Sequence, residues 1–417
     1  MIEITQEQQR AILVGVDTGE YDAAVSLDEL GELATTAGAE VLGKVIQKRP
    51  AVDKATCVGS GMLAEIGDMA ENLDANLLIF DHELTASQMR NIENVTGITV
   101  VDRTTLILDI FAQRARSREG KLQVELAQQK YRLPRLMGMG TVLSRLGGGI
   151  GTRGPGETKL ESDRRHIRRR IEALEEQLRE LEKQRGIRRA RRKKDGVVTV
   201  AIVGYTNVGK STLLNKLTDA GVLAEDKLFA TLDPTARALE LPDGRSVMLV
   251  DTVGLVRRLP HQLVEAFKST LEEAAQADLL LHVCDISSDE ADDQIAVTRQ
   301  LLDELGCAGT PVVTALNKCD KITERPVPMT EDMVLISAAT GYGLDDLLAV
   351  IAKKLAPTQR RMRLLLPYDK AALAAEVRAE GKIFSEEYTA DGLLLDALVD
   401  NKIVWKVEEF QTQKGES

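Results

Sequence analysis

The residues with the clearest chemistry are a glycine-rich turn, a lysine and two hydroxyl residues, in the stretch VVTVAIVGYTNVGKST from Val197 to Thr212. The residues from Gly204 to Ser211 match G-x-x-x-x-G-K-[ST] at every fixed position. The alternative is a chance glycine turn. However, the apolar run before the turn predicts a buried strand and the residues after it predict a helix, as a phosphate-binding loop requires. The stretch therefore predicts a nucleotide-binding site.

Each fixed residue of this loop has a physical task. The two glycines, Gly204 and Gly209, allow backbone N–H groups and the next helix N-terminus to face phosphate oxygens. Lys210 is expected to reach the β- and γ-phosphates, and the Ser211 hydroxyl to ligate Mg²⁺. The residues expected to contact the nucleotide here are Gly204, Tyr205, Thr206, Asn207, Val208, Gly209, Lys210, Ser211 and Thr212.

A second polar group follows a buried strand about a hundred residues downstream, in PVVTALNKCD. Asn317-Lys318-Cys319-Asp320 resembles the N-K-x-D element of GTPases, although this short pattern alone could also be an ordinary turn at a strand end. The Asp320 carboxylate can accept hydrogen bonds from guanine N1–H and from its exocyclic amine, whereas adenine offers neither donor in that arrangement. The element therefore favours guanine.

Two more strand ends complete the pattern. Asp251-Thr252-Val253-Gly254 resembles the D-x-x-G element, whose aspartate binds Mg²⁺ through water and whose glycine N–H meets the γ-phosphate. Ser337-Ala338-Ala339 resembles the loop that backs the guanine. Because four elements occur in the right order, each after its own strand, we interpret the chain as a GTPase with GTP as substrate.

The segment between the phosphate loop and the D-x-x-G element resembles one family in particular. It contains FATLDPT, which is similar to switch I of the HflX family of translation-factor-class GTPases. The resemblance implies that Thr231 is a further Mg²⁺ ligand beside Ser211 and Asp251, with Thr235 as the alternative, and that Lys210, Thr231 and Gly254 serve catalysis. It also implies nucleotide contacts in this segment and a role for Asn207 in seating K⁺. The residues of this segment that are expected to contact the nucleotide are Phe229, Ala230, Thr231, Leu232 and Asp233.

The composition limits the class of protein. The chain has 417 residues, 43% of them hydrophobic and 29% charged, which indicates a soluble globular protein of two to four domains. The sequence shows no signal peptide and no apolar run of about 18 residues, so we expect a cytoplasmic protein without a membrane span. The four cysteines lack C-x-x-C spacing and predict neither disulfides nor a zinc site. We expect a monomer.

The first segment, residues 1–115, alternates strand and helix patterns. Apolar runs at Ala11–Val16, Glu40–Ile46, Ala75–Phe80 and Ile98–Val101, with helical stretches between, predict a small parallel α/β sheet. The whole stretch resembles the amino-terminal domain of the HflX family, which is thought to hold the ribosome. Two groups are better explained as turns than as sites: Val58-Gly59-Ser60-Gly61, with Met62 where the family usually shows lysine, and Asp81-His82 at a strand end.

Two helical patterns follow in residues 116–195. Leucines from Leu122 to Leu133 define one helix that ends before Pro134, and a second begins at Leu160, so the pair predicts an antiparallel hairpin. The glycine-rich string between the two helices could be a flexible connector. However, it carries Arg145, Arg153 and Lys159 and closely resembles the family's sequence, so we favour contact with RNA.

The second helix carries a strong charge asymmetry. Residues 163–195 hold 14 Lys/Arg against 7 Asp/Glu, while the whole chain carries a net charge of −11. Much of the surplus is concentrated in Ile187–Lys194, just before the first strand of the GTPase domain. A solvated linker is the alternative, but like charges at this density repel unless an anion neutralises them. Because the chain has few aromatic residues, we expect phosphate contacts rather than base stacking.

The sequence thus predicts four domains. They are an N-terminal α/β domain (1–115), a helical hairpin (116–195), a P-loop GTPase domain (196–357) and a small C-terminal α+β module (358–417) whose final short pairing includes Trp405. The family resemblance implies a GTPase that binds the large ribosomal subunit and its ribosomal RNA and dissociates stalled ribosomes under stress. The alternatives are a weakly hydrolysing GTP switch in ribosome assembly or RNA chaperoning, and an ATP-driven RNA remodeller using Val58–Gly61.

Overall fold

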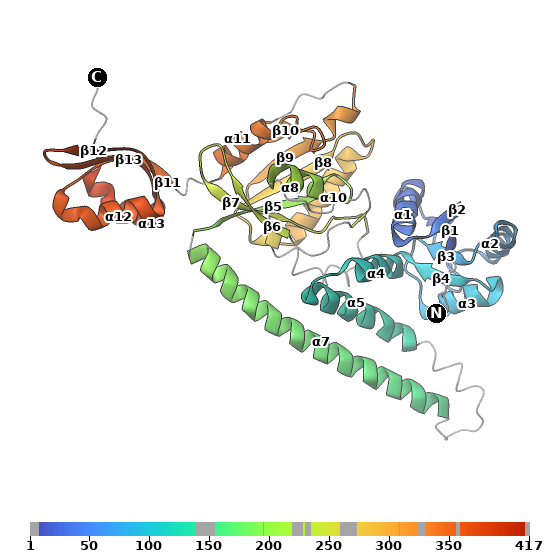
Figure 1. Cartoon of the computed structure of the whole chain (residues 1–417). Coiled ribbons are helices and arrows are strands. Elements are labelled where there is room, and N and C mark those ends of the chain that lie inside the picture. Colours follow the sequence, from blue (N-terminus) through green and yellow to red (C-terminus); the bar gives the residue numbers. More distant parts are fainter. Residues whose placement is uncertain are drawn as a thin grey trace, which may run out of the picture. The chain divides into compact units, whose positions relative to one another are not determined.

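The computed structural model describes residues 8–137, 155–194, 196–218, 228–229, 235–258, 273–307, 309–323, 330–355 and 359–412 (Figure 1). The chain divides into two compact units, Met1–Ala352 and Lys353–Ser417. None of the described helices is long and apolar enough to cross a membrane.

The N-terminal domain is a four-stranded parallel sheet in the order β2-β1-β3-β4. Its strands are β1 (Arg10–Asp17), β2 (Glu40–Lys48), β3 (Leu77–Phe80) and β4 (Thr99–Asp102). Its helices are α1 (Ala23–Ala37), α2 (Ser60–Leu73), α3 (Ala86–Thr96) and α4 (Arg103–Arg114). Connections of this kind between parallel strands need a helix crossover, which the alternating sequence pattern had predicted.

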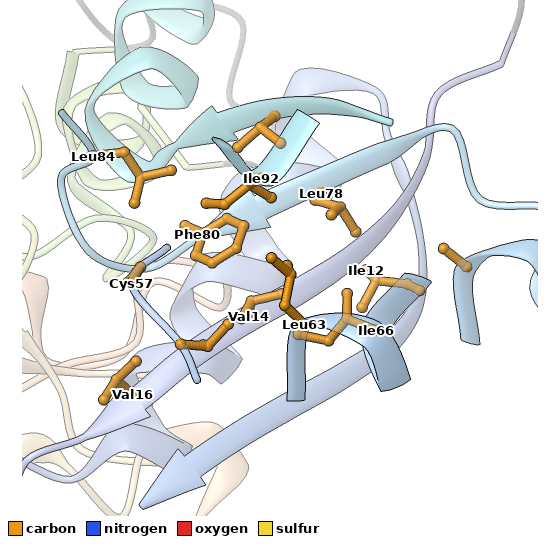
Figure 2. Close-up of a cluster of buried hydrophobic side chains, with 13 residues drawn as sticks. Ile12, Val14, Val16, Cys57, Leu63, Ile66, Leu78, Phe80, Leu84 and Ile92 are labelled. Atoms are coloured by element: carbon orange, nitrogen blue, oxygen red, sulfur yellow. The ribbon is translucent and has the colours of Figure 1, made fainter. Parts of the chain in front are cut away.

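The core beneath α2 and α3 is continuous and apolar. Ile12 and Val14 of β1, Leu78 and Phe80 of β3 and Leu63 of α2 are among the buried side chains that meet there (Figure 2). Helix α3 begins with a capping box, in which Thr85 and Gln88 satisfy each other's backbone N–H groups. The cap fixes where α3 begins beside this core.

Two long helices follow, α5 (Arg118–Met137) and α7 (Pro155–Lys194). Ion pairs connect them in antiparallel order: Arg185 Nη2 lies 3.0 Å from Glu119 Oε1, and Lys130 Nζ lies 3.1 Å from Glu175 Oε1. This confirms the predicted hairpin. Helix α5 does not end before Pro134 as predicted but continues to Met137. Pro134 lies in its last turn and removes only the one bond that a residue 134 N–H would donate to the carbonyl four residues earlier.

The GTPase domain is a six-stranded sheet in the order β10-β9-β8-β5-β7-β6, parallel except for the edge strand β6. Its strands are β5 (Val198–Gly204), β6 (Thr235–Glu240), β7 (Ser246–Asp251), β8 (Leu279–Asp285), β9 (Val312–Asn317) and β10 (Met333–Leu335). Its helices are α8 (Lys210–Thr218), α10 (Ala291–Glu304), the 3₁₀ turn η2 (Cys319–Lys321) and α11 (Leu344–Lys354).

The C-terminal unit has an antiparallel sheet in the order β11-β13-β12. Its elements are β11 (Gln359–Leu366), η3 (Tyr368–Lys370), α12 (Ala371–Glu380), β12 (Lys382–Thr389), β13 (Gly392–Asp400), α13 (Asn401–Val407) and η4 (Glu408–Phe410). The prediction that Trp405 lies in a strand pairing is wrong. Ile403 and Val407, four residues apart, are buried on one face of α13, and Trp405 on another face is 73% exposed.

Candidate functional site

The phosphate-binding loop lies between the end of β5 and the start of α8, as predicted. Gly204 has φ 151° and Gly209 has φ 93°, conformations that L side chains rarely adopt. A Cβ on Gly204 would collide with the Val283 carbonyl, and one on Gly209 would meet the Asn317 amide at 2.5 Å. Backbone conformation and close packing therefore both require glycine at these two positions.

The lysine of this loop is held by the loop itself. Lys210 Nζ donates hydrogen bonds to the carbonyls of Gly204, at 3.1 Å, and Tyr205, at 2.6 Å. Burial lowers the pKa of Lys210 to about 8, although the nearby Asp251 carboxylate opposes this shift. The ammonium group is thus fixed in the hollow of the loop, where an anionic ligand would favour its charged form.

Two of the three predicted Mg²⁺ ligands lie next to each other. The Ser211 hydroxyl donates to Asp251 Oδ2 at 2.8 Å, and Asp251 is fully buried at the end of β7, the neighbour of β5. A hydroxyl and a carboxylate are hard oxygen donors of the kind that Mg²⁺ prefers, so these residues fit the ion. Thr231, with Ala230, Leu232 and Asp233, lies outside the described residues. Thr235 opens β6 in register with Asp251, so the choice between the two threonines stays open.

The D-x-x-G segment is joined to the phosphate loop by its backbone. Leu255 N donates to the Gly204 carbonyl at 3.1 Å, and Thr206 N donates to the Leu255 carbonyl at 2.8 Å. A Cβ on Gly254 would lie 2.7 Å from Thr206 Cγ2 and 3.1 Å from Lys210 Nζ, so no side chain fits there. The Thr206 hydroxyl is buried and has no hydrogen-bond partner among the described residues, which suits a loop that receives phosphate oxygens.

The guanine element is tied to the phosphate loop by Asn317. Its amide Nδ2 donates to the Val208 carbonyl at 2.7 Å, and its Oδ1 accepts from Ala338 N at 2.9 Å. The buried Asn317 side chain therefore connects its own loop with the phosphate loop and with the loop that contains Ala338. Lys318, at φ 63°, forms an ion pair of 2.6 Å with Asp285 at the end of β8.

Asp320 and Ser337 complete this part of the site. Asp320 is exposed, and a hydrogen bond from the Ser337 side chain lowers its pKa, so the carboxylate is ionised and available as an acceptor. Cys319 and Ala338 are buried beside it, and Ala339 follows in the same loop. The structure thus brings the predicted phosphate and guanine residues to one edge of one sheet.

We expect Asn317→Ala to weaken GTP binding about ten-fold and to destabilise the fold by about 1–3 kcal/mol. The reason is that two loops lose their common partner and a buried carbonyl is left unsatisfied. Isothermal titration with GTP and thermal unfolding would measure both effects. Thr340→Ala, at an exposed position in the neighbouring loop that contains Ser337, is the control. Unchanged GTP affinity in Asn317→Ala would contradict this role.

The Val58–Gly61 stretch does not form part of this site, whereas Asn207 lies in the phosphate loop itself. Gly59 opens α2, and its N–H donates to Gln47 Oε1 at 2.8 Å, so the Val58–Gly61 stretch is a strand-to-helix turn. Asn207 is exposed and has φ 61°, which asparagine tolerates better than most residues. Its backbone conformation therefore gives a second reason for asparagine there, beside the K⁺ role.

Sequence reasoning missed the contacts between this site and the N-terminal domain. Asp81 was interpreted as a turn residue, but it is buried and its carboxylate lies 2.6 Å from Arg258 Nη1 and 2.9 Å from Arg103 Nε. These ion pairs hold its pKa below the ordinary range despite burial. Arg258 lies four residues after Gly254 and has φ 52°. The segment after D-x-x-G is thus fastened to the end of β3.

The phosphate loop and the following segments have further contacts of this kind. The Tyr205 hydroxyl donates to Glu29 of α1 and accepts from Arg257 N at 2.7 Å. Phe229, buried and at φ 55°, packs edge-to-face against Phe111 of α4 with ring centroids 4.5 Å apart. No local sequence pattern predicts the contacts with Glu29 and Phe111, because each lies more than a hundred residues from its partner.

Comparison with known proteins agrees with this geometry. Three family models match consecutive stretches: "GTP-binding GTPase N-terminal" (24–112), "GTP-binding GTPase Middle Region" (114–192) and "50S ribosome-binding GTPase" (199–318). A GTPase HflX of Caldanaerobacter subterraneus is 53% identical over 98% of this chain and 95% of its own length, and that of Escherichia coli is 41% identical over 92% of each.

A solved structure, a GTP-binding protein from Sulfolobus solfataricus in complex with GDP, is 27% identical over 84% of this chain and 99% of its own. Its TM-score of 0.45 is too low to establish a shared arrangement. The relatives and the family models establish the family without this structure. The chain is a GTP hydrolase and belongs to the HflX family of GTPases.

Proposed function

We propose that this GTPase binds the large ribosomal subunit through its ribosomal RNA, hydrolyses GTP there, and dissociates or rescues stalled ribosomes under stress. The observation that carries the proposal is the position of the basic charge. Helix α7 bears the surplus of Lys/Arg and ends at Lys194, and β5 of the GTPase domain begins only four residues later at Val198. An RNA-binding surface and the phosphate loop are therefore connected by one short strand.

Mg²⁺ is the metal that we propose, held by Ser211, Asp251 and Thr231, with K⁺ near Asn207. Ser211 and Asp251 lie together, and these oxygen donors would suit a hard cation that neutralises phosphate charge. We further propose that the protein is a cytoplasmic monomer whose four domains have the boundaries 115/116, 195/196 and 357/358.

Sedimentation in a sucrose gradient tests ribosome binding. Intact ribosomes are mixed with the protein and a non-hydrolysable GTP analogue, and we expect the protein to move with the large subunit while the intact particle is split. The protein with GDP is the control. If the protein stays at the top of the gradient with both nucleotides, the proposal is wrong.

A second candidate is a weakly hydrolysing GTP switch in ribosome assembly or RNA chaperoning. Leu255 favours it, because this residue after Gly254 is buried and apolar and cannot orient a water molecule. The two candidates differ in the gradient: an assembly factor would bind free large subunits and leave intact ribosomes whole.

The salt dependence of binding tests the basic end of α7. Replacing Arg188, Arg189, Arg191 and Arg192 by glutamine should lower large-subunit affinity and flatten its dependence on log[salt] by about three to four counterions, since each phosphate contact releases about one. GTP affinity should not change. Arg179→Gln, which changes an exposed arginine that contacts Glu175 and Glu176 of the same helix, is the control. If the dependence of affinity on log[salt] is unaltered in the fourfold variant, residues 187–194 are a solvated linker and do not contact RNA.

A further inference from the structure

A cavity of about 530 Å³ lies between helices α3, α5 and α7, outside the nucleotide site. Its walls come from one face of α3, the end of α5 and the beginning of α7. Cavities of this size are typical of small-molecule and nucleotide-sized ligands. The GTPase mechanism uses none of the residues that line it.

The floor of the cavity is apolar. Ala86 and Met89 of α3, Leu136 of α5 and Ile167 of α7 contribute to it. Methionine and leucine side chains of this kind offer a flat, adaptable surface. A ligand that fills the cavity must therefore present an apolar face, as the plane of a nucleobase does.

The polar groups that line the cavity are three guanidinium groups, one imidazole and two carboxylates. Arg90, Arg132 and Arg135 and the imidazole of His166 line it, together with the carboxylates of Glu93 and Asp163. Guanidinium and imidazole planes stack on bases, and carboxylates accept hydrogen bonds from exocyclic amines. These side chains therefore suit a ligand with a flat ring, N–H donors on that ring and an attached anionic group.

One wall is held rigidly in place. Arg135 Nη2 donates to the Leu84 carbonyl at 2.8 Å and to Asp102 Oδ2 at 3.2 Å, and its guanidinium lies 3.3 Å from the centre of the Tyr131 ring. Asp102 is fully buried at the end of β4. A wall fixed before binding loses little conformational entropy when a ligand enters.

Helix α7 carries further positive charge close in sequence to its lining residues. The α7 residues 163–170 read DRRHIRRR, so five arginines lie in the same short stretch as the three lining residues Asp163, His166 and Ile167. A row of arginines along a helix suits a ligand with repeating phosphates better than a single small anion.

We infer that this cavity receives one unstacked nucleotide of single-stranded RNA, with its base on the apolar floor and the adjoining phosphates on the arginines of α7. The inference rests on the proposed RNA binding and deepens it. It also revises the expectation of phosphate contact alone, because guanidinium groups can replace the scarce aromatic rings as stacking partners. An acidic peptide fits less well, since its carboxylates would face Glu93 and Asp163.

Filling the cavity tests the inference without changing charge. We expect Ala86→Phe to weaken binding of a fluorescein-labelled single-stranded hexaribonucleotide at least ten-fold in an anisotropy titration of the full chain. Asn94→Phe adds the same ring on an exposed part of α3 that does not line the cavity, and should bind as the unmutated protein does. Arg132→Gln, at an exposed position, should also weaken binding and serves if Ala86→Phe fails to fold.

Photocrosslinking with 4-thiouridine in the same hexamer locates the base. Crosslinks to the peptides that contain Met89 or His166 support the inference. Equal affinity in all variants, crosslinks confined to residues beyond Ile187, or tighter binding of an acidic peptide than of RNA would overturn it. Large-subunit sedimentation of the unmutated protein is run in parallel. If the protein sediments with the subunit but the variants bind RNA normally, the inference fails and the proposed function stands.

Discussion

Replacing Asp320 by asparagine is expected to lower GTP affinity at least 30-fold, equivalent to about 2 kcal/mol, and to shift the preference toward xanthosine triphosphate. The carboxylate is ionised, because the hydrogen bond from Ser337 lowers its pKa, and it can accept from two guanine donors at once. An asparagine amide can accept from N1–H but meets the guanine amine with its own N–H₂ group. Xanthine has a carbonyl at that position, which the amide can satisfy.

Competition titrations with GTP, XTP and ATP measure this exchange of specificity. Asp332→Asn removes a carboxylate elsewhere in the same domain and should leave GTP preferred. The protein should remain folded in both variants, since Asp320 is exposed and its loop is held by Asn317 instead. Equal binding of GTP and ATP by the unmutated protein would defeat the assignment of the guanine site.

The parts of this site that could be predicted from the sequence share one property. Gly204, Asp251 and Asn317 each come at the carboxyl end of a strand, and parallel neighbours bring those ends to one edge of the sheet. The short apolar runs therefore predict the strands, and the polar residues that follow them predict which edge of the sheet forms the site. The predicted fold class is confirmed for the same reason, because strand and helix alternate along the chain.

The contacts between the N-terminal domain and the nucleotide site could not be predicted in this way. Asp81 and Arg258 are 177 residues apart, and a lone aspartate at a strand end is normally a turn residue. Only the fold shows that Asp81 is buried and therefore needs a cation. The prediction for Trp405 was wrong for a different reason. Helix α13 has only seven residues, so the helical spacing of Ile403 and Val407 is a weaker signal than the strand-like composition of the segment.

Hydrolysis of GTP is expected to be slow in the free protein and to rise at least about ten-fold with large ribosomal subunits, equivalent to ~1.4 kcal/mol of barrier. The residue after the D-x-x-G glycine, which is a water-orienting glutamine in many GTPases, is Leu255 here. Its side chain is 2% exposed and its backbone is bonded to the phosphate loop on both sides. This position therefore cannot supply the positioning of the attacking water.

Lys210→Ala should slow both the basal and the stimulated reaction by at least about a hundred-fold, because it removes a buried ammonium that we expect to contact the phosphates. Lys216→Ala, in the last turn of the same helix, is the matched control and should retain stimulation. Single-turnover hydrolysis with and without purified large subunits, in potassium and in sodium buffers, measures the rates. Higher rates in potassium would support a K⁺ ion near Asn207. A fast rate in the free protein that subunits leave unchanged would show that the chain orients its own water, by a route that does not involve Leu255.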